Sequence, residues 1–411
     1  MGTFEKMKIV IANLASPANP GDHAILMGTL KLVKRWLKNC EITLVTRAIS
    51  HKNKYKDLNC AVVPSYPDID KISMAPILEK IGHIHQALVN PLPLYRAIAE
   101  ADLIFLAGGA YFYSYRALSP GLTFLAHISP VFWGKVLQKK VIILPGSFGP
   151  FSSTISKRLF DYVVNRSNVI FFREKISGQW MAEQYKDLKA SAAFMPDLAL
   201  YLKSEDLLLK RTGNALKASG WIGVTIRPWH DRKKGLPPYK DELKKTLIHL
   251  HSKFKYKIRI IVQVQADDKE EGDEAVSRQL AEQMTAAVGS ENIEFHTQDP
   301  YYSVQEISKL YRGCELLITM RLHSALLSYI CGRPAFVVGY QHKAKGILES
   351  MGLSDLYIGD SRWIQAEDMI HAIERQIPER SNLTNQINTA LNRSRQVIDQ
   401  AFENHMDEIL G

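Results

Sequence analysis

Two side chains that could bind an anion, Arg321 and His323, directly follow a short apolar run at residues 316–320. The run predicts a buried strand, and the residues after it predict a helix. The N-terminus of that helix and the two side chains would attract the same anion. A second apolar run, residues 335–339, predicts a parallel neighbouring strand that would bring Lys343 to the same edge of the sheet. The spacing therefore predicts a binding site for a small, doubly charged anion.

His323 taken alone is more simply explained as a structural histidine whose hydrogen bonds are satisfied within the fold. Its convergence with Arg321 and Lys343 favours a functional role instead, because cationic groups held together without an anion repel one another. We therefore interpret the three residues as parts of one anion site.

Two further arginines stand where predicted strands end. Arg227 follows the apolar run 221–226 and precedes Pro228, which disfavours a helical conformation for it. A guanidinium held in this way suits bidentate binding of a carboxylate or a phosphate. Arg173 follows the run 169–172 and is either an anion clamp or the partner in a surface ion pair. Its position alone slightly favours the ion pair.

The segment Asn19-Pro20-Gly21-Asp22 stands between the first predicted strand and the first long predicted helix. A glycine in such a turn lets the backbone approach a ligand, and the helix N-terminus attracts anions. Asp22 is expected at the N-cap of the helix. Capping alone and catalysis explain this residue about equally well, and the two roles are compatible.

Glycines also follow two other predicted strands. Gly108-Gly109 comes after the run 103–107, where such pairs are common turn chemistry. The segment 145–150 comes after the run 141–144 and is predicted to form a turn, which could contact a phosphate or be purely structural. Tyr111 could stack on a sugar, but packing in a hydrophobic seam is the simpler explanation.

The order of elements predicts the fold. Short apolar runs alternate with longer segments of helical periodicity, which is typical of parallel α/β units. The pattern lapses in a polar, lysine-rich stretch at residues 197–211, which is predicted to be a linker. We expect two Rossmann-like domains facing across a cleft, at residues 1–205 and 215–380, in a GT-B-like arrangement. Residues 381–411 are expected to form a C-terminal helix that packs across both, and ligands are expected at the carboxyl ends of the strands.

Composition and charge limit the function classes. With 411 residues, 46% hydrophobic and 23% charged, the chain is long enough for two domains and is neither disordered, fibrous nor membrane-embedded. The formal net charge of +10 suits anionic partners such as phosphorylated metabolites or a lipid surface. The basic runs lack the interleaved aromatic residues of a nucleic-acid reader, so no nucleic-acid partner is expected. No signal-peptide pattern and no apolar run near the roughly 20 residues of a membrane span occur, so we expect a soluble, cytoplasmic protein.

Together these motifs resemble the polysaccharide pyruvyl transferase family. The resemblance runs from Lys8 to Leu353, and Arg321-Leu322-His323 with the later Tyr340 and Lys343 is its most specific part. The other matching segments are Asn19-Pro20-Gly21-Asp22, Gly108-Gly109, Gly146-Ser147-Phe148-Gly149-Pro150, Arg173 with Ser177, Pro196-Asp197 and Pro334.

The resemblance implies an enzyme that uses phosphoenolpyruvate as donor and attaches pyruvate as a cyclic ketal to two hydroxyls of a sugar, releasing phosphate. The implied acceptor is a surface polysaccharide or its lipid- or nucleotide-linked precursor, and no metal or organic cofactor is required. The residues assigned to the donor are Arg173, Arg227, Arg321, Leu322, His323 and Lys343. His323, Arg321 and Asp22 are the catalytic candidates, with His323 as acid/base or charge stabiliser and Asp22 as a base for the acceptor. Asn19, Gly21, Gly109 and Tyr111 are assigned to the acceptor.

Two other functions fit the same architecture. A GT-B glycosyltransferase would use a nucleotide sugar and would want a carboxylate for the ribose hydroxyls, whereas Lys343 and His323 fill the predicted site with positive charge. A non-catalytic relative that only binds glycans would not need Arg321, His323 and Lys343. The sequence therefore favours pyruvyl transfer.

Overall fold

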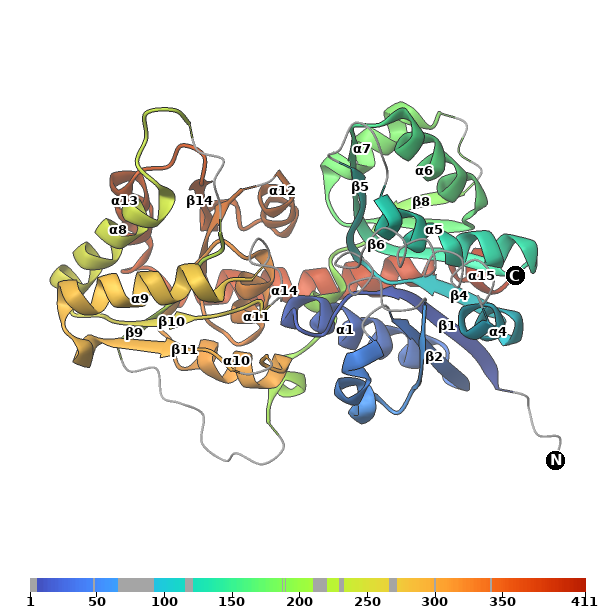
Figure 1. Ribbon diagram of the computed structural model, residues 1–411, viewed down its shortest axis with the longest axis horizontal. Helices are drawn as coiled ribbons and strands as arrows, with labels where there is room; N and C mark the ends of the chain where they lie inside the picture. The colour runs from blue at the N-terminus through green and yellow to red at the C-terminus, as the bar shows by residue number, and fades with distance from the viewer. Residues whose placement is uncertain are drawn as a thin grey trace, which may run out of the picture. The chain divides into compact units, whose positions relative to one another are not determined.

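The computed structural model describes residues 6–46, 49–65, 92–114, 121–186, 188, 190–209, 220–228, 233–265, 272–298, 301–340 and 342–411 (Figure 1). The chain forms two compact α/β units. The first consists of Met1–Pro17, Ile25–Tyr201 and Gln396–Gly411, and the second of Ala18–Ala24 and Leu202–Arg395. Helices α1 (Pro20–Trp36) and α14 (Arg380–Glu403) therefore contribute residues to both units.

The first unit is built on a parallel sheet of strand order β3-β2-β1-β4-β6-β7-β8, with β5 also paired to β6. Its strands are β1 (Met7–Leu14), β2 (Cys40–Thr46), β3 (Ala61–Pro64), β4 (Leu103–Leu106), β5 (Gly109–Ser114), β6 (Lys140–Phe151), β7 (Val169–Phe172) and β8 (Ser191–Phe194). Its further helices are α4 (Leu92–Glu100), α5 (Gly121–Val136), α6 (Thr154–Arg166), α7 (Lys175–Gln184) and α15 (Met406–Leu410), with 3-10 turns η1 (Ile49–Leu58) and η2 (Leu198–Tyr201). All four residues of β4 are buried, because a central parallel strand is covered on both faces.

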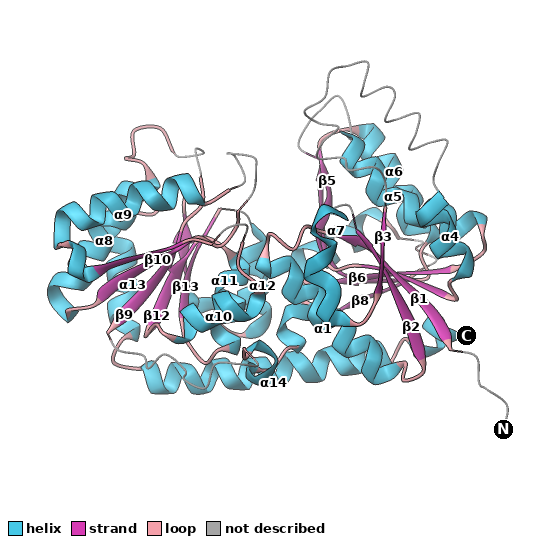
Figure 2. Cartoon of the chain, turned by 60° about the horizontal axis from the view of Figure 1, so that its bottom comes forward, coloured by secondary structure: helices cyan, strands magenta, loops and turns pink. Residues whose placement is uncertain are grey.

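The second unit is built on a parallel sheet of strand order β11-β10-β9-β12-β13-β14. Its strands are β9 (Trp221–Thr225), β10 (Lys257–Ile261), β11 (Ile293–His296), β12 (Leu316–Thr319), β13 (Ala335–Gly339) and β14 (Tyr357–Asp360). Its further helices are α8 (Tyr239–Phe254), α9 (Glu274–Val288), α10 (Val304–Arg312), α11 (Leu322–Ile330), α12 (His342–Met351) and α13 (Ala366–Gln376), with η3 (Ser204–Leu207), η4 (Ser290–Asn292) and η5 (Ser354–Leu356). Helix α8 packs against α9 and α13, whereas α10 packs against α11, so helices line both sides of the sheet (Figure 2).

The first part of helix α14 belongs to the second unit and its last part to the first unit. Towards its start, Arg380 forms an ion pair of 2.7 Å with Glu315 of the second unit. Near its end, Phe402 contacts the rings of Trp36 and Phe105 in the first unit, with centroids 6.2 Å apart in each case. The prediction of one helix over residues 381–411 is wrong at its end, because α14 stops at Glu403 and α15 follows as a separate short helix.

The prediction of parallel α/β units is confirmed, including the pairing of β12 with β13, in which Ile318 lies opposite Phe336. Two predicted turns are wrong. Gly109 begins strand β5, and residues 145–150 lie within the long strand β6. The two segments pair with each other, with Gly109 opposite Gly146. Their backbone groups therefore form hydrogen bonds within the sheet and do not form a loop that could bind a ligand. In the described part of the chain, no helix combines the length and apolar character needed to cross a membrane.

Candidate functional site

The carboxyl edge of the second sheet carries a group of polar and cationic residues. Strands β9, β12 and β13 are consecutive neighbours and run parallel, so the residues that follow them meet at one edge. Arg227 follows β9, Arg321 follows β12 and Tyr340 follows β13, while Lys343 lies in the first turn of α12. Residues far apart in sequence are thus positioned by three adjacent strands.

Tyr340 lies at the centre of this group. The guanidinium carbon of Arg227 lies 4.4 Å from the centroid of the Tyr340 ring, and Arg227 also donates a hydrogen bond to the Tyr340 hydroxyl. Burial opposes ionisation of this hydroxyl, but the positive charges of Lys343, Arg227 and Arg321 hold its pKa below the ordinary tyrosine value. The structure therefore brings together three of the cations that the sequence assigned to one anion.

Arg321 is held by a carboxylate that sequence analysis missed. Its Nε lies 3.2 and 3.1 Å from the two carboxylate oxygens of Asp273, and its Nη2 lies 2.5 Å from Oδ1. The Asp273 side chain is fully buried, and its Oδ2 also accepts a hydrogen bond of 3.1 Å from the backbone N–H of Val264. Burial raises the pKa of Asp273, while Arg321 and Arg227 favour its charged form. The available signal was an acid at the start of a predicted helix, at residues 272–288.

Hydroxyl groups fix the backbone at this junction. Thr319 Oγ1 accepts from the N–H of Arg321 at 2.9 Å and lies 3.0 Å from its carbonyl oxygen. Thr319 is bonded in turn to Thr225 at 2.5 Å, and Thr225 to Ser324 at 3.2 Å. Ser324 donates to the buried Gln263 at 3.0 Å. This buried network leaves Arg321 little freedom to change its direction.

His323 packs against the N-terminus of α1. A β-carbon added at Gly21 would lie 2.5 Å from Cγ and 2.6 Å from Nδ1 of His323, closer than real contacts allow, so only glycine fits there. Asn19 accepts a hydrogen bond from the N–H of Gly21 at 3.0 Å and donates one to Asp22 at 2.8 Å. The predicted N-cap is therefore wrong, since Asn19 caps the helix and Asp22 stands in its first turn. Two sequence motifs some 300 residues apart thus form one site within the second unit.

Arg173 belongs to the first unit and lies in a buried network. Its side chain is 2% exposed, donates to Asp197 at 2.6 Å and to Ser147 at 2.9 Å, and lies 3.9 Å from Glu174. Ser177 also donates to Glu174. The ion pair that its position favoured is present, although buried rather than on the surface. The assignment of Arg173 to the donor stays a prediction.

Gly109 and Tyr111 also lie in the first unit. The Tyr111 hydroxyl donates to the carbonyl oxygen of Ala107 at 2.6 Å, and its ring lies 4.7 Å from that of His127. Burial raises the pKa of Tyr111, against the influence of Asn13 and Arg173. The ring therefore packs against the hydrophobic core of the first unit, as the simpler explanation predicted, and its assignment to the acceptor is untested.

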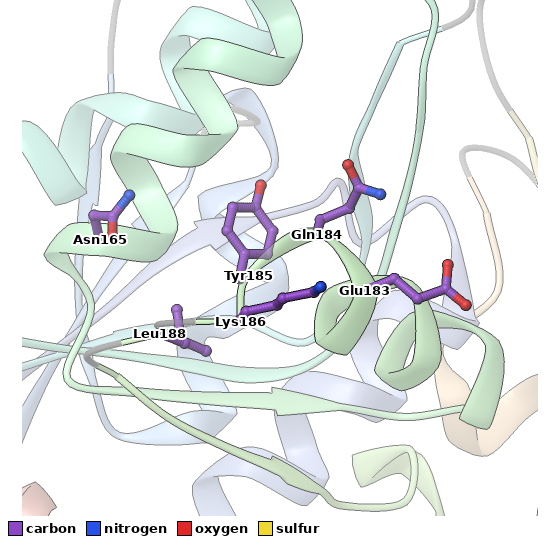
Figure 3. Close-up of a pocket in the computed structure, with 6 residues that line it drawn as sticks. All are labelled: Asn165, Glu183, Gln184, Tyr185, Lys186 and Leu188. Carbon is purple, nitrogen blue, oxygen red and sulfur yellow. The ribbon is translucent and has the colours of Figure 1, made fainter.

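A hollow elsewhere in the first unit contains none of the predicted residues. It is lined by Asn165, Glu183, Gln184, Tyr185, Lys186 and Leu188 (Figure 3). The Tyr185 hydroxyl donates to Asp161 at 2.6 Å, and Gln184 accepts from Lys157 at 2.7 Å. Because these groups are used in structural hydrogen bonds, we assign no function to the hollow.

The fold defines a GT-B-like α/β protein. The UDP-GlcNAc 2-epimerase of Neisseria meningitidis bound to UDP-GlcNAc superposes with a TM-score of 0.60, 10% identity and coverage of 99% of this chain and 100% of that chain. HepE of Anabaena, in complex with UDP and glucose, gives a TM-score of 0.57 and 14% identity, covering 98% and 99%. At such identities the likeness concerns the fold alone.

Residues 19–342 match the polysaccharide pyruvyl transferase family, and the chain belongs to that family. The match begins at the Asn19 motif and includes Arg321 and His323. Amylovoran biosynthesis protein AmsJ of Erwinia amylovora is 22% identical, covering 85% of this chain and 87% of its own. The predicted family is thus confirmed, and with it a transferase class tied to polysaccharide biosynthesis.

Proposed function

We propose that the protein transfers the pyruvyl group of phosphoenolpyruvate onto two hydroxyls of a sugar in a surface polysaccharide or its precursor, forming a cyclic ketal and releasing phosphate. The observation that carries this proposal is the gathering of Arg227, Arg321 and Lys343 around Tyr340. Phosphoenolpyruvate combines a phosphate and a carboxylate on three carbons, so it needs several cations within a small space.

Local structure adds to the attraction for such a donor. Arg321 is the N-cap residue of α11 and Lys343 stands in the first turn of α12, where the helix dipoles favour an anion and disfavour a side-chain cation. A bound acid would satisfy both the dipoles and the side chains. Asp273 holds the Arg321 guanidinium in a fixed direction, which lowers the entropic cost of binding.

The chemistry requires two proton transfers. One sugar hydroxyl adds to the central carbon of the donor, whose methylene carbon gains a proton. The bond from that carbon to the phosphate oxygen then breaks, and the second hydroxyl adds to the resulting cation. Of the two hydroxyl protons, one ends on the methyl group and the other on the phosphate, so no oxidant or reductant is consumed.

His323 and Asp22 are suited to this work by their positions. His323 follows Arg321 by two residues and lies against Gly21, so we assign it the protonation of the departing phosphate or stabilisation of its charge. Asp22 is held by Asn19 in the same segment, and we assign it as the base for an acceptor hydroxyl. Arg321 stabilises the charge that develops on the phosphate as the bond breaks.

The acceptor side of the proposal rests on the family and on AmsJ, whose name places that relative in amylovoran biosynthesis. We propose that Asn19, Gly21, Gly109 and Tyr111 contact the sugar. Because the donor is a cytoplasmic metabolite, we propose that the reaction takes place there. The net charge of +10 suits contact with an anionic membrane surface that carries a lipid-linked acceptor.

The proposal is tested by measuring the release of phosphate from phosphoenolpyruvate in the presence of a panel of glycans and lipid-linked sugars. Mass spectrometry identifies the ketal product. We expect acceptor-dependent release, and protection of the protein from thermal unfolding by phosphoenolpyruvate. Protection by nucleotide sugars alone would replace the proposal with a glycosyltransferase. Binding of glycans without any release of phosphate would indicate a non-catalytic relative.

A further inference from the structure

The hydroxyl of Tyr340 occupies a position that ring stacking does not explain. The ring alone provides the face on which Arg227 lies, at 4.4 Å, and a phenylalanine would do this equally well. The hydroxyl adds a polar group in a partly buried place, and it receives a hydrogen bond from Arg227. A group that is costly to bury and unnecessary for stacking calls for a chemical reason.

The surroundings of the hydroxyl stabilise its deprotonated form. Burial by itself would keep the phenol neutral, but Lys343, Arg227 and Arg321 hold the pKa of Tyr340 below the ordinary value. The nearby carboxylate, Asp273, is engaged by Arg321. These cations come from three segments, after β9, after β12 and on α12, so no single element explains the arrangement.

We propose that the Tyr340 hydroxyl is a catalytic proton donor: it protonates the methylene carbon of the bound donor and regains a proton from an acceptor hydroxyl. This proposal rests on the proposed function. The O–H bond of Tyr340 breaks as the new C–H bond forms, and the three cations stabilise the phenolate. The second sugar hydroxyl returns a proton to the phenolate as it closes the ketal, so the residue is restored after each turnover.

The proposal divides the two protons between two residues. His323 delivers one proton to the phosphate and regains the proton that Asp22 takes from the first sugar hydroxyl, while Tyr340 delivers the other proton to carbon. A tyrosine is suited to the second task because its pKa, once lowered, lies closer to neutrality, where proton transfer is most efficient. The stacked Arg227 holds the ring in place.

The proposal predicts a pH dependence with a definite sign. Tyr340 must be protonated to donate, so kcat/KM falls as the pH rises through the pKa of Tyr340 in the free enzyme, which lies below the ordinary value of about 10. Substitution Tyr340→Phe keeps the ring and its contact with Arg227 but removes the proton. The variant should lose this alkaline limb of the kcat/KM profile, and its kcat should fall by about 100-fold or more.

The matched control is Tyr329→Phe. Tyr329 is a fully buried tyrosine of α11 whose hydroxyl donates to the carbonyl oxygen of Ala335 at 2.7 Å. Loss of this hydrogen bond should lower Tm while leaving kcat and the pH profile unchanged. Phosphoenolpyruvate should protect wild type and Tyr340→Phe from thermal unfolding equally, which shows that the donor site is intact.

The outcomes separate the two proposals. A wild-type protein that releases no phosphate from phosphoenolpyruvate overturns both. If the wild type is active and Tyr340→Phe retains its kcat and alkaline limb, Tyr340 is not the proton donor and the proposed function stands. A raised KM for phosphoenolpyruvate with unchanged kcat would reduce Tyr340 to a positioning partner of Arg227 and would likewise overturn the assignment.

Discussion

Substitution Gly21→Ala should damage catalysis without unfolding the protein. Gly21 lies in the first turn of α1, and its φ is not in the left-handed region. In an ordinary helix the change would stabilise by about 1 kcal/mol, because alanine has the higher helix propensity. Here the added methyl group would lie 2.5 Å from Cγ and 2.6 Å from Nδ1 of His323.

Carbon atoms in contact prefer separations of about 3.5–4.0 Å, so the His323 ring must move by about 1 Å. The crowded atoms include the base of the side chain, and rotation of the ring about its own axis cannot relieve the overlap. A misplacement of about 1 Å can cost about 100-fold in rate. Overpacking costs about 1–3 kcal/mol, which the gain in helix propensity partly offsets, so Tm should change little compared with kcat.

The assay is acceptor-dependent phosphate release, read beside thermal unfolding. Gly134→Ala in α5 is the matched control, since its added carbon would lie 2.8 Å from a methyl group of Val141 and 3.0 Å from one of Ile104. It repeats the crowding in an apolar part of the first unit and should leave kcat unaltered. Near-wild-type turnover by Gly21→Ala would refute the claim that the Gly21 segment fixes the position of His323.

Four other substitutions have distinct expected effects. His323→Ala should abolish turnover with an unchanged far-UV circular dichroism spectrum, and near-native ketal formation would remove the residue from the mechanism. Lys343→Ala should raise the KM for phosphoenolpyruvate more than it lowers kcat; an unaltered KM contradicts its assignment. Asp273→Ala leaves Arg321 without its buried carboxylate, which should destabilise the second unit by about 3–5 kcal/mol in urea unfolding and weaken donor binding. Arg173→Ala should cost about as much in the first unit, and an unchanged midpoint would show that its buried network contributes nothing.

Much of the fold could be predicted because parallel strands covered on both faces are continuous apolar runs. Strand β13 was predicted at its observed bounds for this reason. The errors fall where glycine and proline suggested a turn. Gly146 and Pro150 lie within β6, because pairing with β5 and β7 continues the strand beyond its apolar core. A local signal for a turn cannot reveal that a neighbouring strand is available.

The site was predictable to the extent that it depends on strand ends. Sequence analysis grouped Arg227, Arg321 and Lys343 because residues that follow neighbouring parallel strands lie at the same edge of the sheet. Asp273 was missed because an acid at the N-terminus of a helix is common and suggests no role beyond stabilising that helix. The contact of Gly21 with His323 exists because the first turn of α1 belongs to the second unit, although the rest of α1 belongs to the first. No local sequence pattern predicts this division.

The charges of the site show how it can exist before the donor arrives. Three cations close together repel one another, and Asp273 compensates one of them from a buried position. The remaining positive charge lowers the pKa of Tyr340, which places an ionisable acid where a negative charge is favoured. The charges that attract the donor are therefore the same charges that lower the pKa of the phenol.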